Sequence, residues 1–269
     1  MRRLILTAGQ RARLDLSGAA RDPLIAILVA LMPLATLVFA EHRTPAVVLA
    51  GLPAITAGVV AGLLMVVLVA RERFDGTLTR LRALPRGISC YVIGRTATML
   101  ALVLIAAIAT IAAASVAADM PLPTALSDWT AIAAGIVLSA VAWAVIGIVA
   151  AAVLPSGNPM GAGSMLAQTV ILGILFASAG FQPADDRSTL TRAAVLTLPS
   201  FWSGHLVRQG LLGDEGALDE PGGEWQPGLA LAIIVAWIVI GGLLAAWLLR
   251  RGARRGDGRP ITTTGGASA

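Results

Sequence analysis

Residues that could do chemistry are few in this chain, and their types exclude several classes of reaction. All 20 basic residues are arginines, so no lysine is present for a GxxxxGK[ST] phosphate-binding loop, a Schiff base or a general base. Cys90 is the only cysteine, which excludes an intrachain disulfide and a cysteine-based metal site. The two histidines, His42 and His205, do not have a zinc-binding spacing. We therefore expect no catalytic residue, no metal site and no cofactor bound by this chain.

Ser203 and His205 suggest one enzymatic hypothesis, an intramembrane serine protease. Residues at i and i+2 do not normally face each other on a helix, so a nucleophile and its base would be poorly aligned here. Both residues also fall in a polar segment rather than in an apolar run. A membrane enzyme stays a rival hypothesis, and loss of activity on a membrane-embedded peptide in Ser203→Ala would support it.

The most informative pattern of charged and apolar residues runs from Arg71 to Arg95, between two uncharged runs. Its first part has residues suited to end one helix and to cap the next, Asp75, Gly76 and Thr77. Leu78, Leu81 and Leu84 then recur at helical spacing, and Pro85 ends the pattern. We expect a short amphipathic helix that lies across one end of a membrane bundle and needs a partner surface. The alternative is a solvated basic loop that only fixes the topology.

The composition places the elements around this stretch in a membrane. Of 269 residues, 57% are hydrophobic and 13% are charged, and the mean hydropathy is +0.83, all beyond the norm for soluble proteins. Six apolar runs are each long enough to cross a hydrocarbon core of about 30 Å. They cover residues 23–40, 47–70, 96–118, 129–154, 160–181 and 228–249. The start of the second run could lie on either side of Pro53. The expected fold class is therefore all-α integral membrane, with a six-span domain over residues 23–249.

The segments outside these runs are of three kinds. Residues 1–22 place apolar side chains on one helical arc, which predicts an uncleaved amphipathic helix in the membrane interface. Residues 182–227 hold seven acidic residues, and we expect two short helices there, Ser188–Leu198 and one after Pro199. The simplest interpretation of the second is a helix resting on the membrane surface. Residues 250–269 are expected to be a disordered tail.

The arginines predict which side each connection faces. With both termini in the cytoplasm, the inner segments hold 16 arginines and the outer segments hold 4. Cytoplasmic loops are rich in arginine, so this split favours a multi-pass protein with the 71–95 stretch inside the cell. The net charge of +5 then reflects topology rather than a nucleic-acid partner, because the arginines cluster at the ends of the apolar runs.

Polar residues within the predicted spans are sparse. No span contains Asp, Glu, Arg or His, whereas ion-coupled carriers usually bury such a group near the midplane. Gln168 and Thr169 are the most polar adjacent pair, and either helix packing or a substrate path would explain them. Gly58 and Gly62 form a GxxxG pair, which allows close helix approach but could also arise by chance in a chain with 29 glycines.

The chain resembles the permease subunits of ATP-binding-cassette exporters of the second type, which export drugs, lipids and polysaccharides. Residues Glu72 to Pro85, ERFDGTLTRLRALP, are similar to the family's E-x-x-x-G-T-L-x-x-L-x-x-x-P motif, and Gly94-Arg95 follows after a short gap. Arg21-Asp22-Pro23 and Pro199 through Arg208 are weaker matches. Many members have glutamate directly after G-T-L, whereas this chain has Thr79, so we assign no ion pair with the ATPase at that position.

The resemblance implies a site for an ATPase partner rather than a catalytic site. Thr77 to Leu84 would be the coupling helix, with contact residues Glu72, Arg73, Asp75, Gly76, Thr77, Leu78, Arg80 and Leu81. The pieces between the last two spans would be outer re-entrant helices. Two cytoplasmic ATPase subunits would bind ATP and Mg²⁺, and a second permease copy or a homologous permease would complete the pathway.

The expected function is therefore efflux of a hydrophobic drug, antibiotic or lipid across the bacterial inner membrane, with antibiotic resistance as one outcome. An apolar pathway suits such substrates better than a sugar chain. The rivals to the permease are an ion-coupled secondary carrier, a non-transporting scaffold and the membrane enzyme considered above. Transport driven by an ion gradient alone would favour the carrier.

Overall fold

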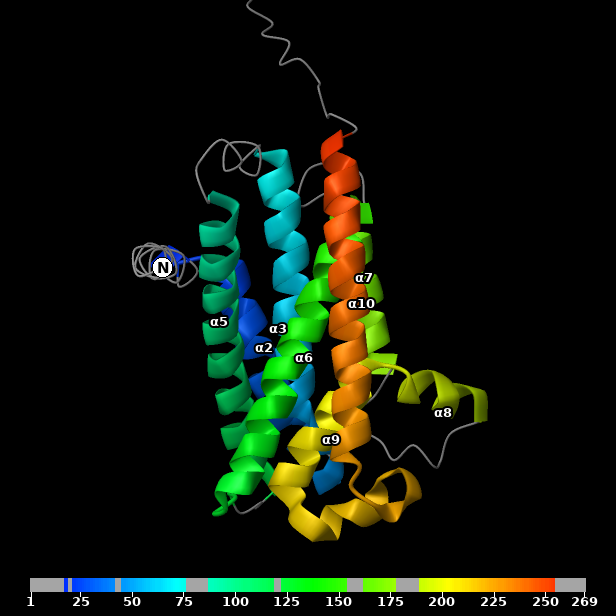
Figure 1. Ribbon diagram of the computed structural model, residues 1–269. Coiled ribbons are helices and arrows are strands. Elements are labelled where there is room, and N and C mark those ends of the chain that lie inside the picture. The colour runs from blue at the N-terminus through cyan, green and yellow to red at the C-terminus, as the bar shows by residue number, and fades with distance from the viewer. Residues whose placement is uncertain are drawn as a thin grey trace, which may run out of the picture.

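The computed structural model describes residues 17–18, 21–41, 45–75, 87–118, 122–153, 162–177 and 189–254. These residues form eight α-helices and two short 3-10 helices, and no strand occurs among them. In chain order the elements are α2 (Pro23–Glu41), α3 (Ala46–Phe74), α5 (Gly87–Ala118), α6 (Leu126–Val153), α7 (Ala162–Ala177), α8 (Thr189–Leu196), α9 (Pro199–Leu212), η1 (Gly213–Asp219), η2 (Pro221–Gly223) and α10 (Pro227–Arg254). The described part of the chain is thus all-helical, as the sequence predicts (Figure 1).

Four of these helices are long and apolar enough to cross a membrane. Their apolar segments are Ala46–Glu72, Arg95–Ala117, Leu126–Val153 and Pro227–Leu248. Two shorter apolar segments, Ile25–Val38 in α2 and Gly163–Leu175 in α7, lie where the first and fifth predicted spans were expected. The four long helices indicate a multi-pass membrane protein, because a bilayer core of about 30 Å needs about 20 apolar residues in a helix.

α3 begins at Ala46 and runs through Pro53, so of the two starts that the sequence left open for the second span, the one before the proline is correct. Other helix boundaries differ from the predicted ones. α5 begins at Gly87 and carries Arg95 within it, and α10 continues past residue 249 to Arg254. The predicted interfacial helix over residues 1–22 and the predicted disordered tail lie mostly outside the described residues. Both therefore stay predictions.

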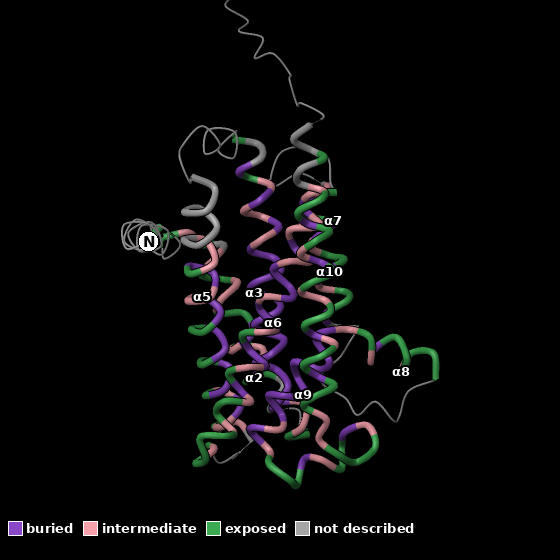
Figure 2. Tube along the Cα trace, viewed as in Figure 1, coloured by how far each residue is buried: buried purple, intermediate pink, exposed green. Residues whose placement is uncertain are grey.

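The central element of the bundle is α3. It packs against α2, α5, α6, α7 and α9, and 83% of its apolar window is buried, whereas only 17% of the window in α10 is buried. Figure 2 shows this contrast along the two helices. Buried aliphatic side chains of α3, such as Leu52, Ile55 and Val59, pack against the neighbouring helices and form the hydrophobic core with them. Many exposed side chains of α10 are large and apolar, as expected for a surface in lipid.

Glycines let the helices around α3 approach closely. A Cβ on Gly147 of α6 would lie 2.5 Å from the Gly62 carbonyl oxygen of α3, and one on Gly58 would lie 2.8 Å from Trp143 Cδ1. Gly210 of α9 similarly meets the Asp128 carbonyl oxygen at 2.5 Å. Both Gly58 and Gly62 thus lie at close helix contacts, which favours packing over chance as the explanation of this pair.

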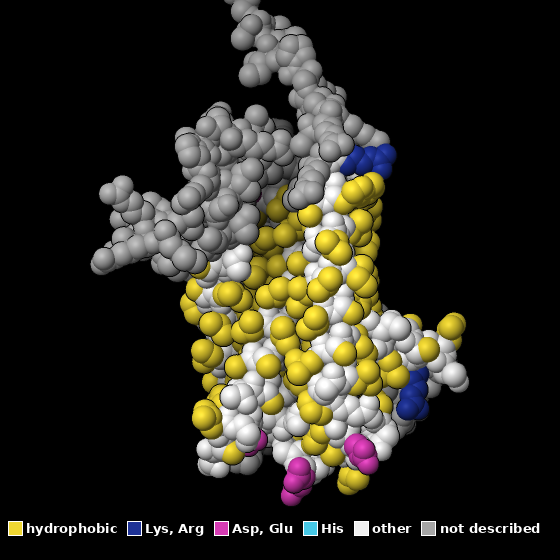
Figure 3. Space-filling view, viewed as in Figure 1, with side chains coloured by type: hydrophobic (Ala, Val, Ile, Leu, Met, Phe, Trp, Pro, Cys, Tyr) yellow, Lys and Arg dark blue, Asp and Glu magenta, His cyan; other side chains and the backbone are white. Residues whose placement is uncertain are grey.

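The two ends of the bundle differ in charge. α3 ends, α5 begins and α10 ends at one end, which we call the arginine end, and α6 begins at the other, which we call the acidic end (Figure 1). On the face seen in Figure 3, acidic side chains gather at the acidic end, basic ones lie at the tip of α10 and over α8, and apolar side chains cover the surface between. This surface suits a protein that spans a membrane between two aqueous compartments.

Candidate functional site

The arginine end carries a buried ion pair that joins the two sides of the 71–95 stretch. Glu72 lies in the last turn of α3 and Arg95 lies in α5, and Arg95 Nη2 donates to Glu72 Oε1 at 2.8 Å. The side chains are only 7% and 19% exposed, respectively. A charge taken out of water is costly unless it is paired, so this contact fixes the end of α3 against α5.

The other predicted contact residues fall into two groups. Asp75 is the C-cap of α3, as expected for a residue that ends the helix, and its exposed carboxylate lies 3.8 Å from Arg71. Arg73 lies in the last turn of α3. The predicted coupling helix lies outside the described residues and stays a prediction. The contact residues concerned are Gly76, Thr77, Leu78, Arg80 and Leu81.

Gln168 and Thr169 do not share one environment. The Gln168 amide nitrogen donates to Ser164 Oγ at 3.2 Å, and Gln168 lines a cavity between α2, α3 and α7. Thr169 is exposed, and its hydroxyl donates to the Met165 carbonyl oxygen of its own helix. Of the two predicted pathway residues, only Gln168 therefore faces a cavity.

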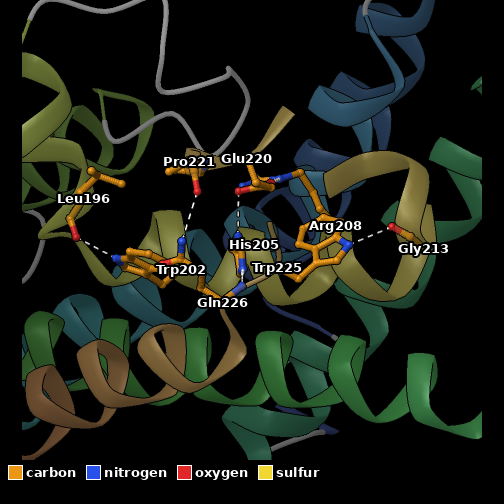
Figure 4. A network of polar contacts seen from close by, with 9 residues as sticks. All are labelled: Leu196, Trp202, His205, Arg208, Gly213, Glu220, Pro221, Trp225 and Gln226. Atoms are coloured by element: carbon orange, nitrogen blue, oxygen red, sulfur yellow. Dashed lines mark hydrogen bonds and ion pairs between the residues drawn. The ribbon is translucent and has the colours of Figure 1, made fainter. Parts of the chain in front are cut away.

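A second buried polar cluster, near the acidic end, was not predicted from the sequence. Its members are His205 and Arg208 of α9 and Glu220, which follows η1; all three are at most 4% exposed. Glu220 Oε2 lies 2.7 Å from His205 Nδ1, and Glu220 Oε1 accepts from Arg208 Nε at 2.5 Å. Figure 4 shows one carboxylate bridging the two side chains. The cluster therefore fastens the chain after α9 back onto α9.

A main-chain contact at the start of α10 fixes the tautomer of His205. The Gln226 N–H donates to His205 Nε2 at 2.9 Å, so Nε2 carries no proton and the Nδ1–H donates to Glu220. Two tryptophans flank the His205 ring, with ring centroids 5.4 Å away for Trp202 and 5.0 Å away for Trp225. The indole nitrogens of these tryptophans donate to the carbonyl oxygens of Leu196 and Gly213, respectively (Figure 4). The ring of His205 thus connects α9, the segment after η1 and the start of α10.

Glu220 is ionised in this arrangement. Burial opposes the charge on its carboxylate, but the hydrogen bond from His205 and the positive charge of Arg208 outweigh it and hold the pKa of Glu220 below its ordinary value of 4.5. The Glu220 carboxylate is therefore shared between the Nδ1–H of His205 and the guanidinium of Arg208.

Ser203 and His205 are not aligned as a nucleophile and its base. The Ser203 hydroxyl donates to the Pro199 carbonyl oxygen at 2.8 Å, and both ring nitrogens of His205 bind other partners. A general base must reach the proton that it abstracts, and no such contact joins these two side chains. Ser203 and His205 therefore stabilise the fold through separate hydrogen bonds, which agrees with the expectation that residues at i and i+2 do not face each other.

The depth of α9 is the main feature that the sequence did not reveal. The simplest interpretation of the sequence places the helix after Pro199 on the membrane surface, but Trp202 is 3% exposed, and 12 of the 14 residues of α9 are buried against α3, α6 and α10. A signal was present, because His205 and Arg208 are three residues apart and therefore share one face, and an acidic residue follows nearby. Polar residues on an otherwise apolar helix indicate a buried partner.

Described residues contain no group of three or more His, Cys, Asp or Glu side chains that could hold a metal ion. Comparison with known proteins adds no relative to this description. No protein-family model matches the chain, and no curated protein matches it. The function of the chain must therefore be inferred from its residues and their geometry.

Proposed function

We propose that this chain is the permease subunit of an ATP-binding-cassette exporter of the second type, in a bacterial inner membrane. The observation that carries the proposal is the Glu72–Arg95 ion pair at 2.8 Å. Glu72 opens the E-x-x-x-G-T-L motif and Arg95 closes the Gly-Arg motif that comes after it. Two motif residues 23 positions apart thus meet in one buried contact, where they hold both ends of the proposed coupling segment.

In this proposal the chain catalyses no reaction itself and works by a change of conformation. Force applied to the segment between α3 and α5 reaches both helices through the ion pair, and α3 touches five other helices of the bundle. A movement of α3 would therefore be passed to most of the bundle. Two cytoplasmic ATPases that close on ATP and Mg²⁺ would supply this movement, and the two states must differ in their contacts for such coupling to work.

The rest of the architecture is assigned on the same basis. We infer six spans, with α2 and α7 as the first and fifth, and both termini in the cytoplasm. α8 and the buried α9 would be the short re-entrant helices on the outer side, in keeping with the place of α9 near the acidic end. A second permease copy, or a homologous permease, would face this chain across the pathway for a hydrophobic drug, antibiotic or lipid.

The test is stimulation of a partner ATPase encoded beside this chain. The full chain and the ATPase are coexpressed and copurified, and ATP hydrolysis is measured in nanodiscs with and without the permease. Gly76→Pro and Leu81→Asp are expected to remain in the membrane and to lose stimulation. Leu218→Asp is the matched control, because Leu218 is 83% exposed in η1, far from the arginine end.

Unchanged stimulation in both variants would contradict the docking site. Copurification with no ATPase at all, together with transport in ATP-free vesicles under an ion gradient, would replace the permease by a secondary carrier. Stimulation is measured in nanodiscs and transport in vesicles, so the two conclusions stay separate.

A further inference from the structure

A cavity lies between α2, α3 and α7, apart from both polar clusters. Its volume is about 140 Å³, below the roughly 300–1,000 Å³ that sites for whole small molecules commonly measure. The cavity can therefore hold one part of a ligand, such as a single chain, rather than a whole drug-sized molecule. Its lining includes Gln168, together with Asp22 and Arg71.

The cavity opens sideways, onto the apolar surface of the bundle. Its back wall includes Leu63 and Leu64 of α3, which are 8% and 4% exposed. On α2, the lining residues Ile27 and Leu31 are 64% and 50% exposed, so the space continues onto the outer surface beside them. A bilayer would cover this surface, and a ligand could therefore enter from the lipid without crossing water.

The dimensions of the cavity suit a single acyl chain. Its lining on α3 extends from Leu63 to Arg71, and at 1.5 Å per residue this is about 12 Å along the helix. One leaflet of a bilayer core is about 15 Å thick. The other lining residues that run along this length are aliphatic: Ile25, Leu28, Val67 and Leu68. An alkyl chain that moves from the bilayer into this cavity would therefore stay in apolar surroundings.

Charged side chains occur only toward the arginine end of this lining. Arg71, in the last turn of α3, carries a guanidinium whose Nε lies 3.8 Å from the exposed Asp75 carboxylate and whose planar set of donors is well suited to a phosphate. Asp22 precedes α2. The carboxylate of Asp22 disfavours a headgroup of net negative charge and favours one that carries an ammonium beside its phosphate. The Gln168 amide donates to Ser164, and its carbonyl oxygen can accept a further hydrogen bond.

We propose that this cavity binds one acyl chain of a zwitterionic phospholipid from the leaflet at the arginine end. The chain lies along α2 and α3, and the phosphate lies beside Arg71. The site does not require an ATPase or the export of the lipid, so it goes beyond the function proposed above. It adds a membrane lipid as a component that holds α2 and α7 against α3.

Photolabelling of the purified full chain in detergent tests the site. The probe is lysophosphatidylethanolamine with a diazirine at the end of its acyl chain, and mass spectrometry locates the adducts. We expect adducts on residues 27–31 and 63–67 that excess unlabelled phosphatidylethanolamine suppresses. The same acyl chain on a phosphatidylglycerol headgroup is expected to label about threefold less, the effect of one exposed charge contact.

Matched variants separate the cavity from the general lipid surface. Val67→Trp fills the cavity and is expected to abolish these adducts, whereas Val239→Trp, on the exposed face of α10, keeps them. Arg71→Gln is expected to reduce labelling about threefold, and Arg251→Gln, at the same end of the bundle, to leave it unchanged.

Three results would overturn the proposal. They are adducts spread equally over α10 and α3, equal labelling by the two headgroups, and an acyl probe that excess phosphatidylethanolamine does not displace. A disulfide-linked dimer of Ile27→Cys, made with Cys90 replaced by serine, would show instead that a second copy fills the cavity. The displacement measurement needs no variant, so it decides the matter even if Val67→Trp does not fold. No nucleotide is present, so failure here leaves the proposed function untouched.

Discussion

Two buried carboxylates, Glu72 and Glu220, each join segments that are distant in the sequence. Glu72 binds Arg95 across 23 residues, and Glu220 binds His205 and Arg208 of the preceding helix. The pairs lie toward opposite ends of the bundle, so neither end depends on apolar packing alone. Removal of either carboxylate takes the counter-charge away from a buried arginine, which commonly costs about 3 kcal/mol of stability.

The Glu220 cluster predicts that the folded chain becomes less stable at acid pH. The pKa of Glu220 is lower in the folded chain than its ordinary 4.5, so its stabilisation is complete above about pH 4.5 and is lost as the pH falls through the folded value. The melting temperature in detergent should therefore fall below about pH 4.5 in the wild type. Glu220→Gln should melt lower at neutral pH and lose much of this acid dependence. A variant that follows the wild-type pH curve would contradict the assignment, and the exposed Glu224→Gln is the control.

Exchange of charges tests the Glu72–Arg95 pair. Glu72→Arg and Arg95→Glu each place two like charges in this buried contact, and each should lower the free energy of unfolding by about 3 kcal/mol or more. The double exchange restores opposite charges and should recover part of this loss. Thermal unfolding of the four proteins in one detergent measures the coupling. Losses that simply add in the double variant would mean that the two side chains do not interact.

At the scale of elements, close contacts at glycine determine how α6 packs on α3 and α9. Gly147 meets the backbone of α3, and Gly135 meets Val207 and the Ser203 carbonyl oxygen of α9. Polar contacts lie in the same interfaces, since Ser139 Oγ donates to the Ala54 carbonyl oxygen at 2.8 Å. Short side chains and such contacts are how helices associate where lipid removes the hydrophobic driving force.

One added methyl group tests these contacts. Gly147→Ala would place Cβ 2.5 Å from a carbonyl oxygen that cannot move without its helix, so the variant should lose about 1–3 kcal/mol of stability. Gly173→Ala, in α7, is the control, because its Cβ would meet no atom within 4 Å. Melting temperatures of the two variants in detergent make the comparison. Equal melting temperatures would show that α6 and α3 are farther apart than described.

Sequence patterns predicted the helices well but not the depth at which one of them lies. Long apolar runs and prolines such as Pro199 determine where helices occur, and these local signals are strong. The burial of α9 depends instead on Glu220 and on glycines of other helices, such as Gly135, and a local pattern does not contain these partners. The Glu72–Arg95 contact was missed for the same reason, although both residues belong to motifs that had been singled out.

At the scale of the molecule, the bundle has two chemically different ends, which predicts its orientation. With Cys90 replaced by serine, a single cysteine can be placed at Glu215 in η1 or at Arg251 in α10, both exposed. In intact cells a membrane-impermeant maleimide should react with Glu215→Cys, and with Arg251→Cys only after lysis. Reaction of Arg251→Cys in intact cells would reverse the orientation and would remove the cytoplasmic ATPase from the proposal.

The position of α3 has a consequence for how a ribosome delivers this protein. α3 is translated before α5, yet α6 and α9, which cover much of its circumference, are made later still. Until then its glycine-bearing flank faces bare lipid or an insertion chaperone. A premature stop before α9 would therefore leave the face of α3 that packs against α9 uncovered, and we expect membrane proteases to degrade such a truncated chain.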